Sequence, residues 1–331
     1  MTRTDVLLVS LGSTGGLRAA DEELRGALER AGARVVLAAA LPPRDVRTMA
    51  LTDLVWARAA RAAARRALAE QRPRAVLYST TTAALMWPEP GAIRYDAPSA
   101  ANRPGRHGIW QRPLERRRLR QAPLLVPQSD GTLAETPSPH APAVVVPIPV
   151  EPSEAAGGVV DRDIAAITYG ANPHKKGLDR ILAAWAAARR DGEKLVVAGT
   201  DRVPAAPGVR NAGRLPPAEY RALLRRARVF VTAPRREDYG IAQLEALADG
   251  CALVTTAAPG PYAALPLARA LDPRLVVEHD AAALAGAQRA ALDEPAPGYA
   301  ARALEAIAPF RHAAVDRTVA EELLPRLLGD A

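Results

Sequence analysis

Two glutamates eight positions apart, with a glycine between them, are the residues of this sequence best placed to do chemistry. Glu237 and Glu245 flank Gly240. The apolar residues 228–232 predict a short buried strand before them, and helical spacing after Gly240 predicts a helix that stops at Gly250. The start of such a helix has unpaired N–H groups and partial positive charge, which suit a phosphate. Carboxylates beside it suit sugar or ribose hydroxyls, because they accept hydrogen bonds well. The combination indicates a nucleotide-sugar site.

This segment resembles the donor site of the family-4 glycosyltransferases (GT4), enzymes of the GT-B fold that carry a Glu-x7-Glu signature. The matching residues are Glu237-Asp-Tyr-Gly-Ile-Ala-Gln-Leu-Glu245, and the helix that they open is followed by Gly250 and a second apolar stretch. Two glutamates at this spacing occur by chance in many helices, so the strand, glycine, helix and second strand together carry the resemblance. It implies an α/β protein of GT-B type, with two facing Rossmann-like domains and a deep interdomain cleft. It also implies an enzyme that transfers a sugar, with retention of configuration, from a nucleoside-diphosphate sugar to an acceptor.

The resemblance assigns roles within the signature. Glu245 is expected to hold the ribose hydroxyls. Glu237 is expected to hold sugar hydroxyls near the reacting carbon and to stabilise the cationic, oxocarbenium-like state. Tyr239, Gly240 and Ile241 are expected to present backbone N–H groups to oxygens of the donor.

A second part of the expected donor site follows residues 163–170, a strand-to-turn segment that repeats the pattern of residues 5–12. Relatives show Gly-Arg and then Lys-Gly, with both cations on the donor diphosphate. Gly170 and Lys176 match this pattern, but Ala171 stands where the arginine would be. Lys176 is therefore expected to stabilise the leaving diphosphate in a half-built clamp.

Two alternatives remain for the missing charge: Lys175 or His174 supplies it, or donor binding is weak. Two further residues are expected at the donor. Gly199 ends a predicted strand, and Arg214 lies where backbone groups of relatives contact the nucleotide base. Backbone contacts do not identify the base.

The first half of the chain opens as strand, Gly-rich turn and helix, which predicts a parallel doubly wound sheet. The turn with Gly15 and Gly16 lacks the Gly-x-Gly-x-x-Gly spacing, so a nicotinamide cofactor is not expected. These two glycines either face donor phosphates or acceptor in the cleft or form only a turn.

Two later strands of this half, residues 74–78 and 92–95, also end in polar residues and should do so at the ligand-binding edge of the sheet. Many relatives have a His-Asp pair after the later strand, and here Tyr95-Asp96 keeps only the aspartate. Asp96 is the expected acceptor-side residue, with loop residue His107 as an alternative for the imidazole. Ser129 ends the next strand in a Gln-Ser pair.

Three segments are expected. Residues 1–150 would form the N-terminal acceptor-binding Rossmann-like domain, and residues 151–310 the C-terminal donor-binding Rossmann-like domain. Residues 311–331 would form a C-terminal helix that packs back toward the first domain. Pro- and Gly-rich stretches between residues 137 and 158 mark the crossing.

Composition limits the partners. The 331 residues include 44 Lys and Arg against 36 Asp and Glu, giving a net charge of +8. Such a charge suits an anionic substrate, an anionic membrane or nucleic acid. No nucleic-acid motif accompanies it. The Arg-rich helix predicted over residues 114–120 is interpreted as a solvated face or as a contact with anionic lipid headgroups.

The sequence shows no signal peptide and no 18-residue apolar run, which predicts a cytoplasmic protein, with peripheral contact at the inner membrane face left open. The oligomeric state stays open. Asp161-Arg162-Asp163 fits the Asp-x-Asp metal motif of GT-A transferases but lies at a strand entry, and we interpret it as linker. No metal and no cofactor are therefore expected.

Three other readings of the sequence stay open. An epimerase or phosphorylase would use the same fold, and a non-catalytic nucleotide-sugar sensor is favoured by the absent arginine and histidine. A basic nucleic-acid-binding protein would explain only the charge.

Overall fold

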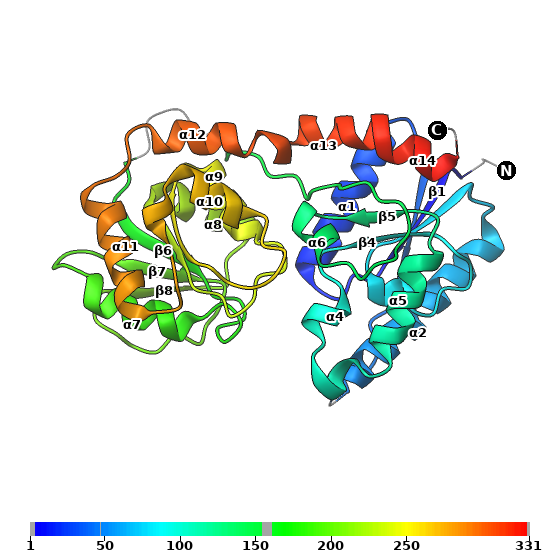
Figure 1. The fold of residues 1–331 in the computed structure, drawn as a ribbon, viewed down its shortest axis with the longest axis horizontal. Coiled ribbons are helices and arrows are strands. Elements are labelled where there is room, and N and C mark those ends of the chain that lie inside the picture. The colour runs from blue at the N-terminus through cyan, green and yellow to red at the C-terminus, as the bar shows by residue number, and fades with distance from the viewer. Residues whose placement is uncertain (1–3, 47, 154–160, 330–331) are drawn as a thin grey trace. The chain divides into compact units, whose positions relative to one another are not determined.

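The chain folds into two units, each built on its own parallel sheet (Figure 1). The computed structural model describes residues 4–46, 48–153 and 161–329. The first unit comprises Met1–Pro149 and His312–Ala331, and the second comprises Val150–Arg311. No helix in these described ranges is both long enough and apolar enough to cross a membrane.

The first unit has a five-stranded sheet in the order β2-β1-β3-β4-β5, with every pair of neighbours parallel. Its strands are short and largely buried, as expected when helices cover both faces of a parallel sheet. The strands are β1 (Val6–Ser10), β2 (Val35–Ala39), β3 (Ala75–Tyr78), β4 (Ala92–Tyr95) and β5 (Leu125–Pro127). The helices are α1 (Gly15–Arg30), α2 (Met49–Glu70), α3 (Thr81–Ala84), α4 (Ser99–Asn102), α5 (Gln111–Gln121) and α6 (Asp130–Ala134), with a 3-10 turn η1 (Gly105–Gly108).

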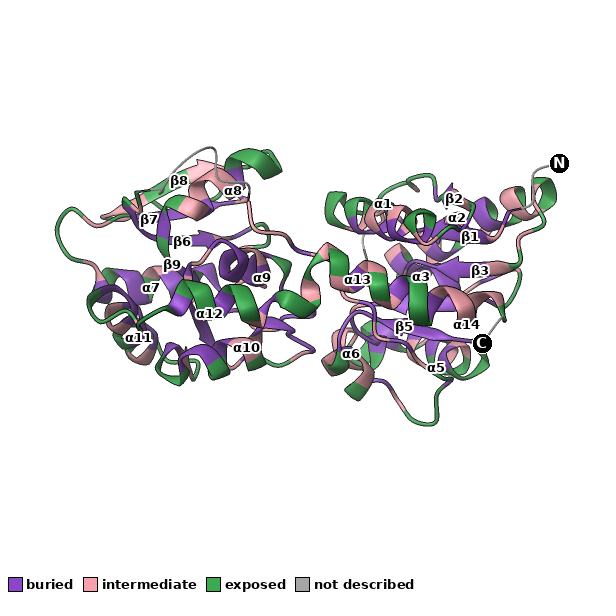
Figure 2. Ribbon diagram, turned by 90° about the horizontal axis from the view of Figure 1, so that it is seen from above, coloured by how far each residue is buried: buried purple, intermediate pink, exposed green. Residues whose placement is uncertain are grey.

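Two layers of helices cover this sheet. On one face, α2 packs through Ala60, Ala63 and Ala64 in the same cluster as Leu119 of α5. Alanines at helical spacing let the backbone of α2 lie close to the strands, which suits a chain with few aromatic residues. The other face is covered by α1 together with the end of the chain (Figure 2).

The last helical run belongs to the first unit. It consists of α13 (His312–Thr318), a π-helical turn η4 (Val319–Leu323) and α14 (Leu324–Leu328). Val315, Val319 and Leu323 are buried in the same cluster as residues of α1. The sequence predicts a single helix within residues 311–331, and the structure inserts a π turn into it.

The second unit has a six-stranded sheet in the order β11-β10-β9-β6-β7-β8, again with parallel neighbours. The strands are β6 (Ile164–Tyr169), β7 (Leu195–Ala198), β8 (Val209–Gly213), β9 (Ala227–Thr232), β10 (Ala252–Thr256) and β11 (Val276–Val277). The helices are α7 (Leu178–Ala188), α8 (Pro217–Arg226), α9 (Ile241–Ala248), α10 (Ala264–Leu271), α11 (Ala281–Asp293) and α12 (Tyr299–Ala306), with 3-10 turns η2 (Pro273–Leu275) and η3 (Ala308–Phe310).

One side of the predicted Arg-rich helix is anchored inside the first unit. It spans Gln111–Gln121 as α5, and Glu115 is buried, with its carboxylate accepting a hydrogen bond from the Ser99 N–H. Arg118 donates to the Leu85 carbonyl and stacks over Trp87. The helix is therefore anchored on one side, and only part of it is a solvated basic face.

Candidate functional site

The loop between β9 and α9 carries the glutamate signature and ends in a glycine that no other residue can replace without strain. Gly240 has φ of 90°, in the left-handed region, and a Cβ built on it would lie 3.1 Å from the ring of Tyr262. No side chain caps the N-terminus of α9. Tyr239 is buried, and Ile241 is 38% exposed at the first helical position. A helix start without a side-chain cap is the kind of position that can bind an anion.

Glu237 lies in this loop as a buried carboxylate with two side-chain partners. Its side chain is held by the Lys176 ammonium, at 2.6 Å, and by the Gln243 amide, at 2.9 Å, both on Oε2. Residue 237 is only 4% exposed. The structure therefore brings Glu237 and Lys176, which are 61 positions apart, into one ion pair.

A second ion pair lies beside the first. The Lys175 ammonium contacts Asp238 at 2.6 Å, and Arg236 contacts the same carboxylate at 2.8 Å. Burial alone would raise the pKa of Asp238, but the two cations lower it below its ordinary value. The charge of Lys175 is thus already matched by an aspartate next to Glu237.

Residues 170–177, which link β6 to α7 and carry Lys175 and Lys176, form what we call the lysine loop. This loop approaches the end of β9 closely enough to require a glycine. Gly177 has φ of 66°, and a Cβ built on it would lie 1.9 Å from the Ala233 carbonyl oxygen. The Arg235 N–H donates to the Lys175 carbonyl at 2.9 Å. These contacts fix the two loops to each other and set the position of Lys176.

Glu245 lies one turn into α9 in a different environment. Arg221 of α8 lies 3.7 Å from Glu245 Oε1 and donates through Nε to Asp249 at 2.8 Å. Burial raises the pKa of Glu245 to about 7, Arg221 opposes this rise and Asp249 adds to it. This carboxyl therefore changes protonation near neutral pH.

The remaining predicted residues of the second unit lie at the carboxyl ends of β6, β7 and β8. Gly170 follows β6 and donates its N–H to the Ala198 carbonyl, at 2.8 Å. Gly199 has φ of 89°, and a Cβ there would lie 2.7 Å from the Tyr169 ring. Arg214 is exposed and lies 3.7 Å from Asp201.

Sequence reasoning missed three residues of this region. Gln243 is buried in a helix whose other residues, apart from Glu245, are apolar, and this is a signal visible in the sequence. Tyr169 is half-buried at the end of β6, with its ring 5.2 Å from that of Tyr220. Arg221 approaches Glu245 only through the packing of α8 beside α9, and no spacing in the sequence indicates it.

In the first unit, the predicted residues lie at the ends of β1, β4 and β5. Gly15 and Gly16 are the first two residues of α1, which the Thr14 side chain caps. The sequence predicted a turn there, and the cap starts the helix two residues earlier. Ser129 caps α6 by accepting the Thr132 N–H at 3.1 Å.

The Ser129 and Asp96 segments are brought together by one threonine. The Thr132 hydroxyl donates to the Asp96 carbonyl at 2.6 Å and lies 3.0 Å from Ser129 Oγ. Asp96 is half-buried, and its carboxylate accepts the Ala97 N–H at 2.9 Å. Tyr95, where relatives have histidine, is buried with its hydroxyl 2.8 Å from that of Thr136. His107 is exposed in η1.

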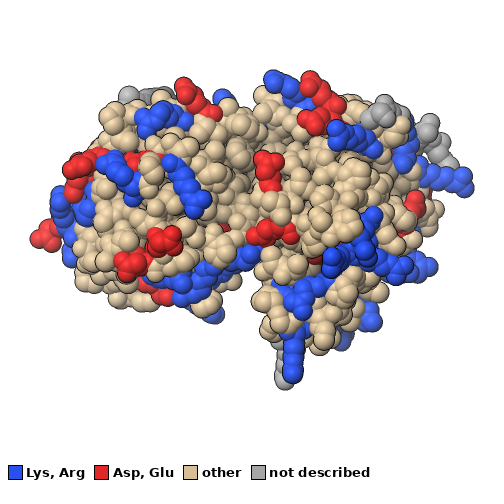
Figure 3. All heavy atoms as spheres, viewed as in Figure 1, with Lys and Arg blue, Asp and Glu red and all other residues tan. Residues whose placement is uncertain are grey.

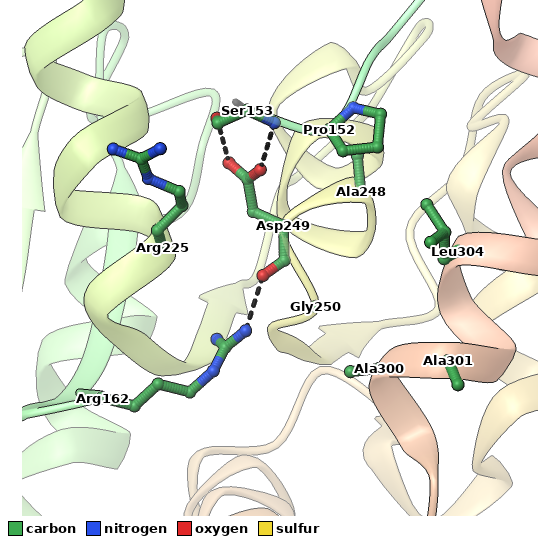
Figure 4. A pocket seen from close by; sticks show the side chains of 10 residues that line it. All are labelled: Pro152, Ser153, Arg162, Arg225, Ala248, Asp249, Gly250, Ala300, Ala301 and Leu304. Carbon is green, nitrogen blue, oxygen red and sulfur yellow. Dashed lines mark hydrogen bonds between the residues drawn. The ribbon is translucent and has the colours of Figure 1, made fainter. Parts of the chain in front are cut away.

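A hollow of the second unit lies away from these residues (Figure 4). It measures about 440 Å³ and is lined by Asp249 and Gly250 at the C-terminal end of α9, by Arg162 and by residues of α12. Asp249 accepts two hydrogen bonds from Ser153, and its carbonyl accepts one from Arg162. The predicted donor residues do not line it, so shape alone does not identify the site.

Within residues 4–46, 48–153 and 161–329, no three His, Cys, Asp or Glu side chains lie close enough together to hold a metal ion. Of the Asp-x-Asp motif, Asp163 forms a salt bridge with Arg226.

Comparisons with known proteins give the class of enzyme. Residues 164–294, within the second unit, match the model of a protein family described as "Glycosyl transferases group 1". No curated protein matches the chain in sequence. The expected enzyme class, a glycosyltransferase, is confirmed.

Solved structures confirm the GT-B fold. Sucrose-phosphate synthase from Thermosynechococcus elongatus is 15% identical with a TM-score of 0.75, and 100% of each chain is covered. HepE from Anabaena, in complex with UDP and glucose, is 12% identical with a TM-score of 0.71, over 97% of this chain and 99% of that one. A UDP-forming α,α-trehalose-phosphate synthase from Burkholderia xenovorans, in complex with glucose-6-phosphate, is 15% identical with a TM-score of 0.67, over 99% and 100%.

Proposed function

We propose that this protein is a retaining glycosyltransferase of the family-4 type that uses a nucleoside-diphosphate sugar and needs no metal ion. The observation that carries the proposal is the ion pair of Glu237 with Lys176 beside the uncapped start of α9, with Glu245 one turn into the same helix. HepE, which shares the fold, is described with UDP and glucose. UDP is therefore the first nucleotide to test.

The diphosphate is proposed to bind at the start of α9, against the N–H groups of Tyr239, Gly240 and Ile241. Lys176 then exchanges its bond to Glu237 for a phosphate oxygen and stabilises the charge that develops on the leaving diphosphate. The acceptor oxygen bonds to the anomeric carbon on the face from which the diphosphate departs, and the acceptor proton leaves with the diphosphate. Once released from Lys176, Glu237 accepts hydrogen bonds from sugar hydroxyls and stabilises positive charge at the anomeric carbon.

Around this centre, Glu245 is proposed to hold the ribose hydroxyls, and Gly170, Lys175, Gly199 and Arg214 to border the nucleotide. Asp96, Ser129, Gly15 and Gly16 of the first unit are proposed to serve the acceptor side. These residues do not identify the acceptor. We propose a cytoplasmic location, with the basic surface in contact with the inner membrane face.

The first test is thermal stability of the full chain with UDP, GDP, ADP or dTDP, with and without magnesium. A ligand at about one hundred times its dissociation constant adds roughly 2.7 kcal/mol to the free energy of unfolding. One nucleotide is expected to stabilise the protein without magnesium. Stabilisation that requires magnesium would contradict metal independence, and no stabilisation by any of the four would contradict the donor site.

A variant tests the site itself. Replacing Glu245 with alanine is expected to weaken nucleotide binding by about 1–3 kcal/mol, because the ribose hydroxyls lose their acceptor. Isothermal titration calorimetry measures this change. The matched control is Glu305→Ala, which removes an exposed carboxylate on α12 and is expected to leave binding unchanged.

A nucleotide-sugar sensor is the second candidate, favoured by Ala171 in place of a phosphate-binding arginine and by the ion pair that occupies Lys176. Release of nucleotide from a UDP-sugar, followed by chromatography, separates the two. A transferase releases UDP in the wild type and much less in Lys176→Ala. A sensor binds the same donor and releases none.

A further inference from the structure

A second hollow of the second unit, of about 250 Å³, lies between the starts of α7 and α11. These two helices pack against each other, and strands of the sheet lie between α7 and α9 (Figure 1). We call this cavity the α7–α11 hollow. Its described lining contains none of the residues proposed to bind the donor.

One polar side chain that lines the α7–α11 hollow is buried without a partner. Thr256 ends β10 and is 1% exposed, and its Oγ1 has no hydrogen-bond partner among the residues that the structure describes. The hydroxyl of its neighbour Thr255, in contrast, lies 2.8 Å from that of Tyr262. An unpaired buried hydroxyl costs about 1–3 kcal/mol. A hydroxyl in this position therefore indicates a ligand that bonds to it.

An arginine and a histidine of the lining present N–H groups. Arg180 Nη1 lies 2.9 Å from His279 Nδ1. Because a guanidinium only donates, Nδ1 accepts this bond and the ring proton lies on Nε2. Burial and the Arg180 charge lower the pKa of His279 below its ordinary value, which keeps the ring neutral. The pair thus offers hydrogen-bond donors through His279 Nε2 and through the other N–H groups of Arg180.

Two aspartates of the lining supply acceptors. Asp179 accepts hydrogen bonds of 2.9 and 2.7 Å from Arg235, which matches its charge. Asp280 caps α11 through Oδ2, which accepts the Ala283 N–H at 2.6 Å, so its Oδ1 is left to accept from a ligand. Two carboxylates against Arg180 and Arg235 give no net charge. Figure 3 shows acidic and basic side chains interspersed on this side of the second unit.

Donors and acceptors without net charge match a sugar ring, because each sugar hydroxyl both donates and accepts. Ala183 and Leu284 add apolar surface for the C–H groups of the ring. The volume equals roughly eight waters at about 30 Å³ each, which is room for one ring. We propose that the α7–α11 hollow binds a single neutral sugar ring, with Thr256, His279 and Asp280 bonded to its hydroxyls. The proposal goes beyond the transferase function, since donor and acceptor are assigned to other residues.

The test is ligand-observed NMR of the full chain with the methyl α-glycosides of glucose, galactose and mannose. The wild type is expected to bind at least one of them, and inorganic phosphate should not displace it. Thr256→Val should weaken this binding about fivefold, because one hydrogen bond is lost. The stability of this variant should stay the same or rise, since Thr256 has no protein partner to lose. A role of Thr256 in the fold alone would not separate the two readouts.

A second variant fills the cavity. Ala183→Phe should weaken glycoside binding more than about tenfold, because its ring takes the space of the sugar. The matched control is Ala187→Phe, at an exposed position of the same helix outside the hollow, which should bind as the wild type does. Binding of UDP should be equal in all these variants, so a failure of the donor site is distinguishable from a failure of this one.

Three outcomes would overturn the proposal. The first is that the wild type binds none of the glycosides, or that phosphate displaces them, which would indicate an anion site. The second is equal glycoside binding by Ala183→Phe and Ala187→Phe. The third is that Lys176→Ala loses glycoside binding while Ala183→Phe keeps it, because the sugar would then occupy the donor site.

Discussion

Glu237 is buried and Glu245 is half-buried, and their surroundings give the two glutamates of the signature different properties. Glu237 has a lysine and an amide within hydrogen-bond distance, so its negative charge is matched inside the protein. Glu245 has an arginine at 3.7 Å that is itself bonded to Asp249, and burial raises its pKa to about 7. In the proposed mechanism, Glu237 separates from Lys176 and binds the sugar of the donor. Glu245, which changes protonation, binds the ribose.

Gln243 is expected to position Glu237. Its amide donates to the Glu237 carboxylate at 2.9 Å from a fully buried position. Gln243→Leu removes this donor and should lower the free energy of unfolding by about 1.5–3 kcal/mol, the range for hydrogen bonds to charged groups. Chemical denaturation measures the change, and donor binding should weaken with it.

The matched control is Gln288→Leu in α11, also buried, whose two side-chain polar atoms have no hydrogen-bond partner. Removing unpaired buried polar atoms should leave stability unchanged or raise it. Equal losses in both variants would show that Gln243 acts only by filling space.

Glu245 should make stability depend on pH. Its pKa is about 7 in the folded protein and 4.5 in the ordinary state, so the folded state holds the proton more tightly. The resulting cost is absent below pH 4.5, grows between pH 4.5 and 7, and is complete above pH 7, where it amounts to about 3 kcal/mol. Glu245→Gln should therefore stabilise the protein at pH 8 and lose this advantage as the pH falls to 4.5. A constant difference between the two proteins across this range, in urea denaturation, would contradict the raised pKa.

At the scale of elements, the sequence predicts those strands and helix ends that are determined by residues close together in the chain. The strand before the signature, Gly240 as the start of α9 and Gly250 after it follow from apolar spacing and glycine placement, and all are present. Glu115 shows what local patterns miss. Its charged neighbours suggest a solvated helix, but the Ser99 N–H, 16 residues away, binds its carboxylate inside the unit. Arg221 escapes prediction for the same reason, because helix packing alone brings it to Glu245.

The conformation of the lysine loop should depend on a glycine at position 177, because no other residue fits there without strain. In Gly177→Ala, the new methyl group is strained by the left-handed backbone and also collides with the Ala233 carbonyl. We expect the free energy of unfolding to fall by about 2–5 kcal/mol. Gly192→Ala is the control, with φ of 83° and no atom within 4 Å of a built Cβ, and should lose only about 1–2 kcal/mol. Thermal unfolding gives both values. Nucleotide binding should fall in the first variant alone, because displacing the loop moves Lys176, and equal behaviour of the two variants would contradict this account.

At the scale of the whole molecule, the chain leaves the first unit at Pro149 and returns to it at His312. The returning helices supply part of the first core, through Val315, Val319 and Leu323 against α1. Arg30 of α1 adds two hydrogen bonds of 2.8 Å to Asp316 at the surface. The first unit is thus completed only by the last residues of the chain, whereas the second unit closes its core within one continuous segment.

This organisation predicts that the two units respond to different changes. Leu323→Ala opens a cavity in the first core and should destabilise that unit by about 2–5 kcal/mol, whereas Arg30→Ala removes an exposed ion pair and should cost about 0–1 kcal/mol. In differential scanning calorimetry, we expect two transitions, because each unit has its own core. Leu323→Ala should lower one of them, and the nucleotide that binds beside α9 should raise the other. A nucleotide that raises the transition lowered by Leu323→Ala would place its site in the first unit, and a single transition moved by both would show that the units unfold together.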